Sequence, residues 1–365
     1  MLSSCVGVWV CSIEFKTQDM TEPKNILWTG SHGFIAGYAI TKLLDQGHRV
    51  WGIDNFWKYG NTTKEYDSHP RFTLIQGDAK DIDLLRKVVF DNQIQIFVAG
   101  AAIIGGITLF HELAYDILAE NEKLTCAAFD VCIEAHRTST FFEKILVISS
   151  SMVYENVTSY PSSESDITHY PPPSSTYGFQ KLAVEYFAKG AYEQYKLPYT
   201  IIRPFNAIGI GEKRAKFENE VYSGNIKMAM SHVLPDLVQK IYKGQYPLHV
   251  LGSGEQIRHY TYAGDLADGI ITAMFHPAAL NNDFNISIDR GHTVKELAEA
   301  VWKYMGKSDP LTFEHDTPYQ WDVQKRVPDT RKSKEVLNIE CSTNLETALE
   351  EIVPWIIEQI QLGNI

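Results

Sequence analysis

Short apolar strands alternate with apolar helices through the first half of this chain, and this alternation constrains the fold more than any other feature. Helical segments separate most of the strands, including residues 119–137 and 175–196. The six predicted strands lie in NILWTG, HRVWGID, RFTLIQGD, IQIFVAGAA, EKILVISSS and LPYTIIRPFN. Such alternation is typical of a parallel sheet with helices on both faces. We therefore expect an α/β fold with a doubly wound parallel sheet of the Rossmann type.

The alternation loosens after Asn206, which indicates a second, smaller part of the chain. LHVLGSG predicts another strand, and AGDLADGIITAMFH predicts a helix that returns to the first domain. The polar loop at residues 211–224 either closes over a ligand or stays solvated. The expected division is an N-terminal extension at 1–24, a Rossmann domain at 25–205 joined by 246–276, and an interleaved substrate-binding domain at 206–245 and 277–365.

Charge and cysteine content exclude several classes of protein. The 365 residues carry a formal net charge of -12, and an acidic surface repels phosphate backbones, so nucleic-acid binding is not expected. The apolar N-terminal run is too short to span a bilayer, so no membrane association is expected. Five widely spread cysteines argue against a disulfide framework and favour a cytoplasmic protein. No cluster of ligating residues has metal-site spacing, so no metal is expected.

A glycine-containing turn, WTGSHGFIAG, follows the first predicted strand directly. Gly30 and Gly33 stand where the chain must turn sharply and approach a pyrophosphate, and Ala36 takes the third small-residue place. The helix that begins there offers free backbone amides to the phosphates. Because a strand precedes the turn and a helix follows it, the pattern predicts a dinucleotide site. The expected contacts from this turn are Gly30, Ser31, His32, Gly33, Phe34 and Ile35.

A carboxylate at the end of the second predicted strand indicates which dinucleotide binds. Asp54 lies 21 residues after Gly33 (54 − 33), where a carboxylate accepts hydrogen bonds from ribose hydroxyls and repels a 2′-phosphate. This favours NAD over NADP. Asp78, at the end of the third strand, either reaches the adenine or caps the following helix. The other expected cofactor contacts are Asn55, Ala79, Ala101 and Lys181.

A strand end and the following helix supply a candidate proton-transfer set. VISSSMVYE ends the fifth strand, at the edge where ligands bind in such sheets. In TYGFQK, Tyr177 and Lys181 lie one helical turn apart on the same face. We expect Ser150 to orient the substrate, Tyr177 to remove a proton, and Lys181 to bind ribose and lower the pKa of the phenol. Ordinary packing is the alternative explanation for the pair.

The motifs TGxxGF, Asp54, SSSxVY, YxxxK, RPFN and GxGxQxR together resemble the extended short-chain dehydrogenase/reductase family. They run from Asn25 to about Ile352, which is nearly the whole chain. Within that family the chain looks like a nucleotide-sugar epimerase or dehydratase. The resemblance implies bound NAD, a nucleotide-diphosphate-sugar substrate and a homodimer formed through a four-helix interface.

The resemblance also implies a set of substrate contacts. Asn206 in RPFN would contact the diphosphate, and Arg258 would bind nucleotide phosphate or ribose. Arg326 would do the same from the C-terminal domain, because a guanidinium presents a planar fork of donors to phosphate. A surface ion pair is the alternative for Arg326, and Asn121 would support the active-site helix. The remaining implied contacts are Ser151, Met152, His232, Val233 and Asp329.

The residue before VY separates reaction types in the family that the chain resembles. Dehydratases and decarboxylases usually carry glutamate there, and 3,5-epimerising members carry cysteine. This chain has Met152, whose thioether is no useful proton donor or acceptor. A 4-epimerase needs neither group, because one tyrosine serves both directions through a transient 4-keto sugar. We therefore expect C4 epimerisation with Tyr177 as acid and base, without a prediction of the base or the sugar.

Three departures leave other functions open. AGAAIIGGI and SHVLPDL look more like the GDP-fucose synthase and GDP-mannose epimerase branch, where His232 falls at a position used as an acid. A dehydratase or 3,5-epimerase/reductase that uses His232 is the alternative, although a phosphate contact or a packed neutral ring is a commoner role. Ala99 stands where many relatives have histidine, and Glu155 where glycine is usual. A non-catalytic cofactor-sensing protein is disfavoured because the catalytic set is complete.

Overall fold

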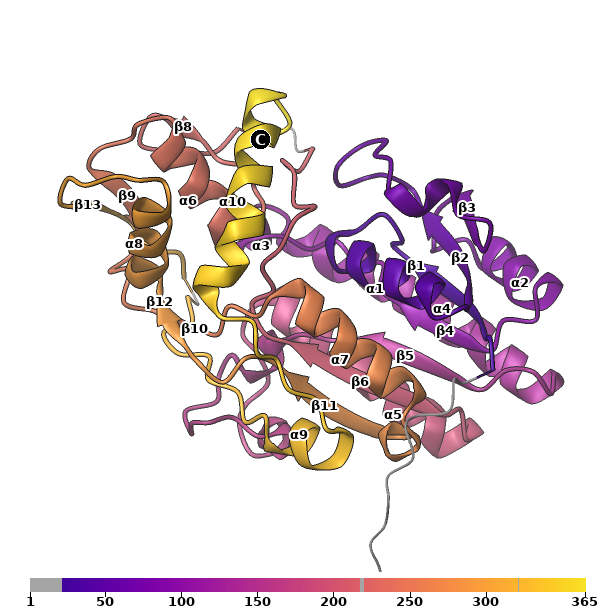
Figure 1. Cartoon of the computed structure of the whole chain (residues 1–365). Helices are drawn as coiled ribbons and strands as arrows, with labels where there is room; N and C mark the ends of the chain where they lie inside the picture. Colours follow the sequence, from indigo (N-terminus) through magenta and orange to yellow (C-terminus); the bar gives the residue numbers. More distant parts are fainter. Residues whose placement is uncertain (1–21, 217–219, 321) are drawn as a thin grey trace, which may run out of the picture.

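A seven-stranded sheet, parallel throughout, forms the centre of the computed structural model, which describes residues 22–216, 220–320 and 322–365 (Figure 1). The strand order is β11-β6-β5-β4-β1-β2-β3. The strands are β1 (Asn25–Thr29), β2 (Arg49–Asp54), β3 (Phe72–Gln76), β4 (Ile96–Ala99), β5 (Lys144–Ile148), β6 (Tyr199–Pro204) and β11 (Asn282–Ile286). The predicted extension lies, up to residue 21, outside the described residues.

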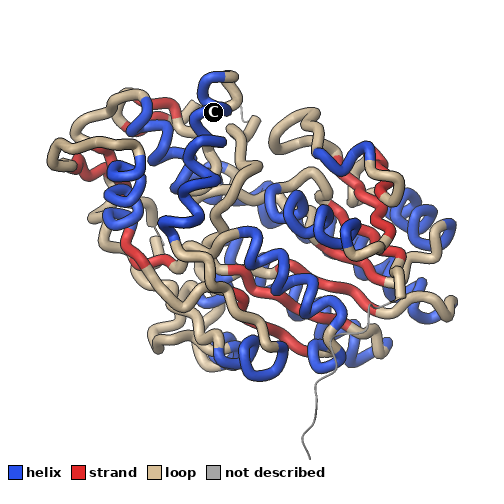
Figure 2. Tube along the Cα trace, in the orientation of Figure 1, coloured by secondary structure: helices blue, strands red, loops and turns tan. Residues whose placement is uncertain are grey.

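Helices cover both faces of this sheet, as Figure 2 shows. One face packs against α1 and α7 through side chains such as Leu43 and Ile270. The other face packs against α2, α4 and α5 through side chains such as Val89, Ala128 and Val184. Their bounds are α1 (Phe34–Asp45), α2 (Ile82–Asp91), α4 (Ala114–Thr138), α5 (Thr176–Tyr195) and α7 (Ala263–Phe275). This arrangement confirms the predicted doubly wound α/β fold.

A smaller lobe packs its own apolar core beside the sheet, around Leu237, Leu297 and Leu349. Its larger elements are α6 (Val233–Tyr242), α8 (Val294–Tyr304), α10 (Leu345–Gln361), β9 (Leu248–Leu251) and β13 (Phe313–Asp316). The remaining strands and α-helices are β7 (Tyr222–Ser223), β8 (Ile226–Lys227), β10 (Ile257–Arg258), β12 (His292–Thr293), α3 (Ile107–Glu112) and α9 (Arg331–Leu337). The 3₁₀ turns are η1 (Glu65–Ser68), η2 (Ser151–Tyr154), η3 (Glu164–Thr168) and η4 (Pro277–Ala279).

Two strands lie elsewhere than the predicted division places them. Residues 246–276 were expected to return to the Rossmann domain. Within this range β9 does not return, because it pairs with β13 outside the main sheet. The helix α7 does return, and it packs on α1. β11 extends the main sheet beside β6, although residues 277–365 were assigned to the substrate-binding domain. The strand was overlooked because its sequence, NDFNI, is polar at buried places. The separation into two domains otherwise stays a prediction.

A fully buried guanidinium explains how polar residues are accommodated in β11. Arg203 on β6 is 0% exposed and donates to both carboxylate oxygens of Glu185 on α5, at 2.8 and 2.6 Å. It also donates to Asp283 on β11 at 2.6 Å and to the Tyr154 hydroxyl at 2.8 Å. Tyr154 in turn donates to Asn285 on β11 at 2.7 Å. The network fixes the positions of α5, β6 and β11 relative to one another.

Removal of Glu185 tests this network. Glu185→Ala leaves Arg203 buried with one carboxylate fewer, so we expect the free energy of unfolding to fall by about 3–5 kcal/mol. Urea unfolding followed by circular dichroism measures the loss. The matched control is Asp91→Ala, which removes the exposed Lys87–Asp91 pair and should leave the midpoint unchanged. Equal midpoints for the two variants would contradict the assigned role of the network.

Candidate active site

A cavity of about 970 Å³ opens at the carboxyl ends of the sheet strands and extends into the smaller lobe. The strand order reverses between β1 and β4, the place where ligands bind in sheets of this type. The predicted site residues that line the cavity are Gly30, His32, Gly33, Phe34, Ile35, Asp54, Asn55, Asp78, Ala79, Ala101, Ser150, Ser151, Met152, Tyr177, Lys181, Asn206, His232, Val233, Arg258 and Arg326. Residues from distant parts of the chain are therefore brought together.

Two of the predicted site residues lie outside the cavity lining. The Ser31 side chain is fully buried, and its hydroxyl lies 3.2 Å from Nδ1 of His32. A Cβ on Gly52 would come 2.5 Å from that hydroxyl, so Ser31 packs beneath the turn. Asp329 forms an ion pair with Arg331, two residues later in the sequence. Both side chains have partners within the protein, and their predicted ligand contacts stay predictions.

The turn after β1 has the backbone that a pyrophosphate site requires. Gly30 has a φ of +71°, and a Cβ there would lie 2.9 Å from Cα of Ala101. Only glycine allows this conformation and this close approach of the two loops. α1 begins after Gly33, which has no side chain to cap the helix, so its first amides are free for phosphate oxygens.

Asp54 is held in place by the same turn. Its carboxylate accepts hydrogen bonds from the amides of His32 at 2.9 Å and Phe56 at 2.8 Å. Each oxygen keeps a second lone pair for a ribose hydroxyl. Asp78 does not cap α2, because Asp81 does so by accepting from the amide of Leu84. Together with the glycine turn, the carboxylates of Asp54 and Asp78, which line the cavity, fit a dinucleotide without a 2′-phosphate.

Tyr177 lies at the first turn of α5, buried beside the end of β5. Ser150 lies two residues after the end of this strand and caps η2, accepting from the amide of Met152 at 3.2 Å. Burial raises the pKa of Tyr177 to about 12, and a hydrogen bond with Ser150 and the positive charge of Arg326 oppose this rise. The hydroxyl is therefore a phenol whose ionisation depends on these two neighbours.

Lys181 is the other half of the predicted pair, and its ammonium is engaged elsewhere. Nζ donates to the carbonyl of Ile148 at 2.9 Å and lies 6.0 Å from the centre of the Tyr177 ring. Burial lowers the pKa of Lys181 to about 8, and the negative charge of Glu185 opposes this decrease. The cation that lowers the pKa of Tyr177 here is Arg326. The expected effect of Lys181 on the phenol stays a prediction.

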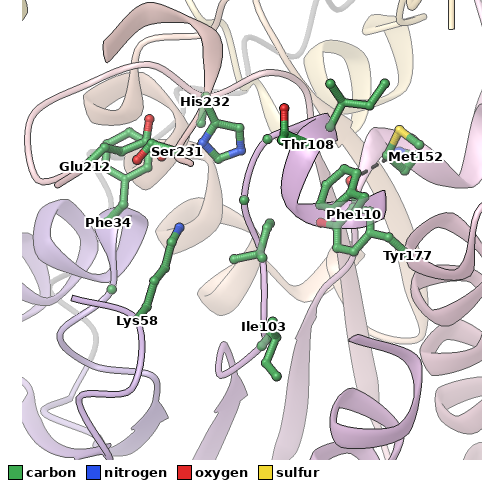
Figure 3. A pocket seen from close by; sticks show the side chains of 18 of the residues that line it. Phe34, Lys58, Ile103, Thr108, Phe110, Met152, Tyr177, Glu212, Ser231 and His232 are labelled. Carbon is green, nitrogen blue, oxygen red and sulfur yellow. Dashed lines mark hydrogen bonds and ion pairs between the residues drawn. The ribbon is translucent and has the colours of Figure 1, made fainter. Parts of the chain in front are cut away.

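Phe110 on α3 covers the ring of Tyr177. The two ring centres lie 4.2 Å apart and the planes differ by 14°, which is a stacked arrangement (Figure 3). Met152 and Ile103 belong to the same apolar cluster and also line the cavity. The sequence around Phe110, GGITLFHE, carries no motif, so this contact could not have been predicted.

His232 lies across the cavity from Tyr177, grouped with Lys58, Glu212 and Ser231 in Figure 3. His232 is the residue before α6, whose amides its side chain does not cap. Its Nδ1 pairs with the carboxylate of Glu212, whose side chain is 3% exposed. Burial lowers the pKa of Lys58, and Glu212 opposes that change. Glu212 was overlooked because its loop, GEKRAKFENE, is indistinguishable from a solvated one in the sequence. Within the predicted loop, Glu212 and residues 221–223 line the cavity.

Several polar atoms at the smaller-lobe side point to a ligand. Nε of Arg326 and Oδ1 of Asn206 are buried without a hydrogen-bond partner among the described residues, and both side chains line the cavity. Arg258 pairs with Asp322 at 3.0 Å. Asn121 does not act on the catalytic helix directly; it holds the loop after β4 through both backbone groups of Ile103. A buried donor such as Nε of Arg326, or a buried acceptor such as Oδ1 of Asn206, is costly without a partner unless a ligand satisfies it.

Comparison with known proteins assigns a family to this architecture. The model of the NAD dependent epimerase/dehydratase family matches residues 26–287. A UDP-N-acetyl-alpha-D-glucosaminuronate decarboxylase of Bacillus cytotoxicus is 27% identical over 92% of this chain and 98% of its own. A UDP-glucose 4-epimerase of Halalkalibacterium halodurans is 26% identical over 90% of this chain and 95% of its own.

A solved structure has the same fold. The crystal structure of UDP-glucuronic acid 4-epimerase from Bacillus cereus, in complex with UDP-glucuronic acid and NAD, superposes with a TM-score of 0.76. The match covers 92% of this chain and 99% of that one, at 23% identity. This likeness supports the fold. Among the described residues, no helix has the length and apolar character needed to cross a membrane.

The turn at Gly30 can be tested by one methyl group. Gly30→Ala places a Cβ against Ala101 and forces alanine to a φ of +71°, which costs about 1–2 kcal/mol before any clash. We expect NAD affinity, measured by calorimetric titration, to fall about tenfold or more. Gly190→Ala is the control, because a Cβ there meets nothing within 4 Å. Unchanged affinity in Gly30→Ala would show that the turn does not approach the cofactor.

Proposed function

The chain belongs to the NAD dependent epimerase/dehydratase family, and on that basis we propose that it is an NAD-dependent nucleotide-sugar 4-epimerase. The observation that carries the proposal is the pairing of Tyr177 with Ser150 at the cavity wall, while Met152 occupies the place of a second acid or base. Elimination and decarboxylation use an additional proton carrier next to the sugar carbon. Inversion at C4 does not.

The residues of the chain carry out the proton transfers. NAD, when bound by the glycine turn and Asp54, supplies the hydride acceptor. Tyr177 takes the proton of the C4 hydroxyl. The single hydroxyl proton of Ser150 is donated to the phenolate before this transfer and to the substrate oxygen during it. The hydrogen bond from Ser150 and the charge of Arg326 stabilise the phenolate. The same phenol returns the proton when the hydroxyl forms again in the inverted configuration.

The substrate that best fits the cavity is a sugar linked to a nucleoside diphosphate. Both relatives named above act on UDP-linked sugars. Arg258, Arg326 and the free amides at the start of α6 present donors to a diphosphate from the smaller lobe. Asn206 presents its amide beside them. These residues contact the diphosphate, so they do not identify the nucleotide base or the sugar of the substrate.

The pair formed by His232 and Glu212 supports a second candidate function. A carboxylate on Nδ1 orients the imidazole, as in other acid–base pairs, and leaves Nε2 without a partner among the described residues. With such a group across from Tyr177, a dehydratase or a 3,5-epimerase/reductase is the alternative. It would exchange a carbon-bound proton with solvent, which the 4-epimerase would not.

A homodimer is part of the proposal, supported by aromatic side chains on the outer surface of α4 and α5. Tyr115 is 79% exposed and Tyr186 is 63% exposed, with Phe179, Phe187 and Tyr192 also exposed. Exposed aromatic groups on two packed helices are typical of a protein–protein interface. Two copies joined there would form a four-helix contact. A cytoplasmic location stays a prediction.

Product analysis in heavy water tests the reaction. UDP-, GDP-, CDP- and dTDP-sugars are incubated with the enzyme, and proton NMR follows C4 inversion and deuterium uptake. Inversion without deuterium is the expected outcome; deuterium at C3 or C5 would favour the alternative.

Substitution of Tyr177 tests the proposed acid and base. Tyr177→Phe should lower kcat by about 10²–10⁴-fold with NAD still bound, because the phenol can no longer transfer a proton. The rise of kcat/KM with pH on the acidic side, which reports loss of the phenol proton, should disappear. Tyr192→Phe on the same helix is the control and should keep full activity. Normal turnover in Tyr177→Phe would exclude Tyr177 as the acid and base.

Introduction of a charge at the aromatic surface tests the dimer. Tyr186→Glu places a carboxylate in the proposed interface, so analytical ultracentrifugation should show a shift from dimer to monomer at micromolar concentration. Tyr304→Glu, at a 41% exposed site on the smaller lobe, should remain dimeric. A monomeric wild-type protein would contradict the proposed interface.

A further inference from the structure

A buried carboxylate behind the cavity wall connects the two elements that carry the catalytic hydroxyls. η2 begins after Ser150 and is followed by Glu155, whose amide donates to the carbonyl of Met152 at 3.2 Å. The Glu155 residue is 9% exposed and does not line the cavity. It therefore acts on the reaction through other residues and not by contact with a ligand.

The carboxylate of Glu155 binds the start of α5. It accepts from the amide of Ser175 at 3.0 and 3.2 Å and from the Ser175 hydroxyl at 2.6 Å. The same hydroxyl accepts from the amide of Gly178 at 3.0 Å and so caps the helix. Tyr177 lies between these two residues in the sequence. Glu155 thus holds Ser175 directly and Gly178 indirectly, through the Ser175 hydroxyl.

The first turn of α5 lies tightly against η2 at this point. A Cβ on Gly178 would come 2.8 Å from the Glu155 carboxylate and 2.9 Å from the carbonyl of Met152. Glycine is needed here because the helix and the turn touch backbone to backbone. A carboxylate at the start of a helix also interacts favourably with the helix dipole.

We propose that Glu155 is a positioning residue, which fixes the Tyr177 hydroxyl relative to Ser150 by binding the first turn of α5 to η2. The inference rests on the proposed function, in which these two hydroxyls act on one substrate oxygen. Proton transfer requires heavy atoms within about 2.6–3.2 Å, so a small shift of the helix start is costly.

Charge gives the link a second, measurable consequence. The groups that act on the Tyr177 hydroxyl are Ser150 from η2 and Arg326 from the smaller lobe, with Lys181 on α5 itself bound to a carbonyl. The negative charge of Glu155 acts on the guanidinium of Arg326 and offsets part of its positive charge. Without that carboxylate the phenolate is favoured, so the pKa of Tyr177 falls. A group with a purely structural role would not shift this pKa.

Two variants and a matched control test the proposal in the full-length enzyme. Glu155→Gln keeps the shape but loses the charge and one acceptor, and Glu155→Gly removes the link. We expect kcat for C4 inversion to fall about tenfold and about 100-fold respectively, with KM changed less than about threefold. The acidic limb of the pH profile should move to lower pH in Glu155→Gln. Asp166→Asn is the control, because Asp166 accepts from the amide of Ser163 at 2.8 Å without reaching α5.

Hydrogen exchange gives a readout that does not depend on activity. Residues 175–181 should exchange faster in Glu155→Gln than in Asp166→Asn, and the rest of the sheet should stay protected. Equal exchange in the two variants, or equal kcat with only KM raised, would overturn the positioning role. A wild-type enzyme that inverts no sugar would end the proposed function, while the exchange data would still decide whether Glu155 holds the helix.

Discussion

The buried guanidinium of Arg203 is the interaction on which the rest of the site depends. It binds Glu185 on α5 and Asp283 on β11. These ion pairs, which are largely buried from water, fix the helix that carries Tyr177 to the edge of the sheet. Glu185 also accepts from the hydroxyl of Ser149, the residue before Ser150, at 2.6 Å. The end of β5 and the middle of α5 are thereby aligned before any ligand contact. Glu155 completes this alignment at the other end of the helix segment.

Much of the fold and part of the site could be predicted, because they depend on local patterns. Alternating apolar segments identified six of the seven strands of the main sheet, and the glycine turn, Asp54 and the pair of Tyr177 and Lys181 were found from their spacing. These signals lie within a few residues of one element boundary. β11 lacked such a signal, because its buried polar residues are satisfied by Arg203 and Tyr154, which are far away in the sequence.

The contacts that could not be predicted all join distant segments. Phe110 stacks on Tyr177 from α3, Glu212 pairs with His232 from a loop, and Arg326 acts on the phenol from the last sixty residues of the chain. The composition of the chain also gave no indication of the charges around the cavity. A chain with a net charge of -12 still collects Arg258, Arg326, Lys58 and Lys181 around one opening. The charges that surround a cavity are set by the fold and not by the net charge of the chain.

Arg326 and Tyr177 belong to different parts of the molecule, and this has a consequence for catalysis. The guanidinium comes from a segment beside the smaller lobe, whereas the phenol is fixed to the sheet through α5. The acidity of the hydroxyl is therefore a measure of how closely the two parts approach. Any movement that takes Arg326 away from Tyr177 would remove the charge that opposes the effect of burial, so the phenol would hold its proton more firmly. In the proposed reaction, proton transfer is therefore most favourable while Arg326 lies near Tyr177.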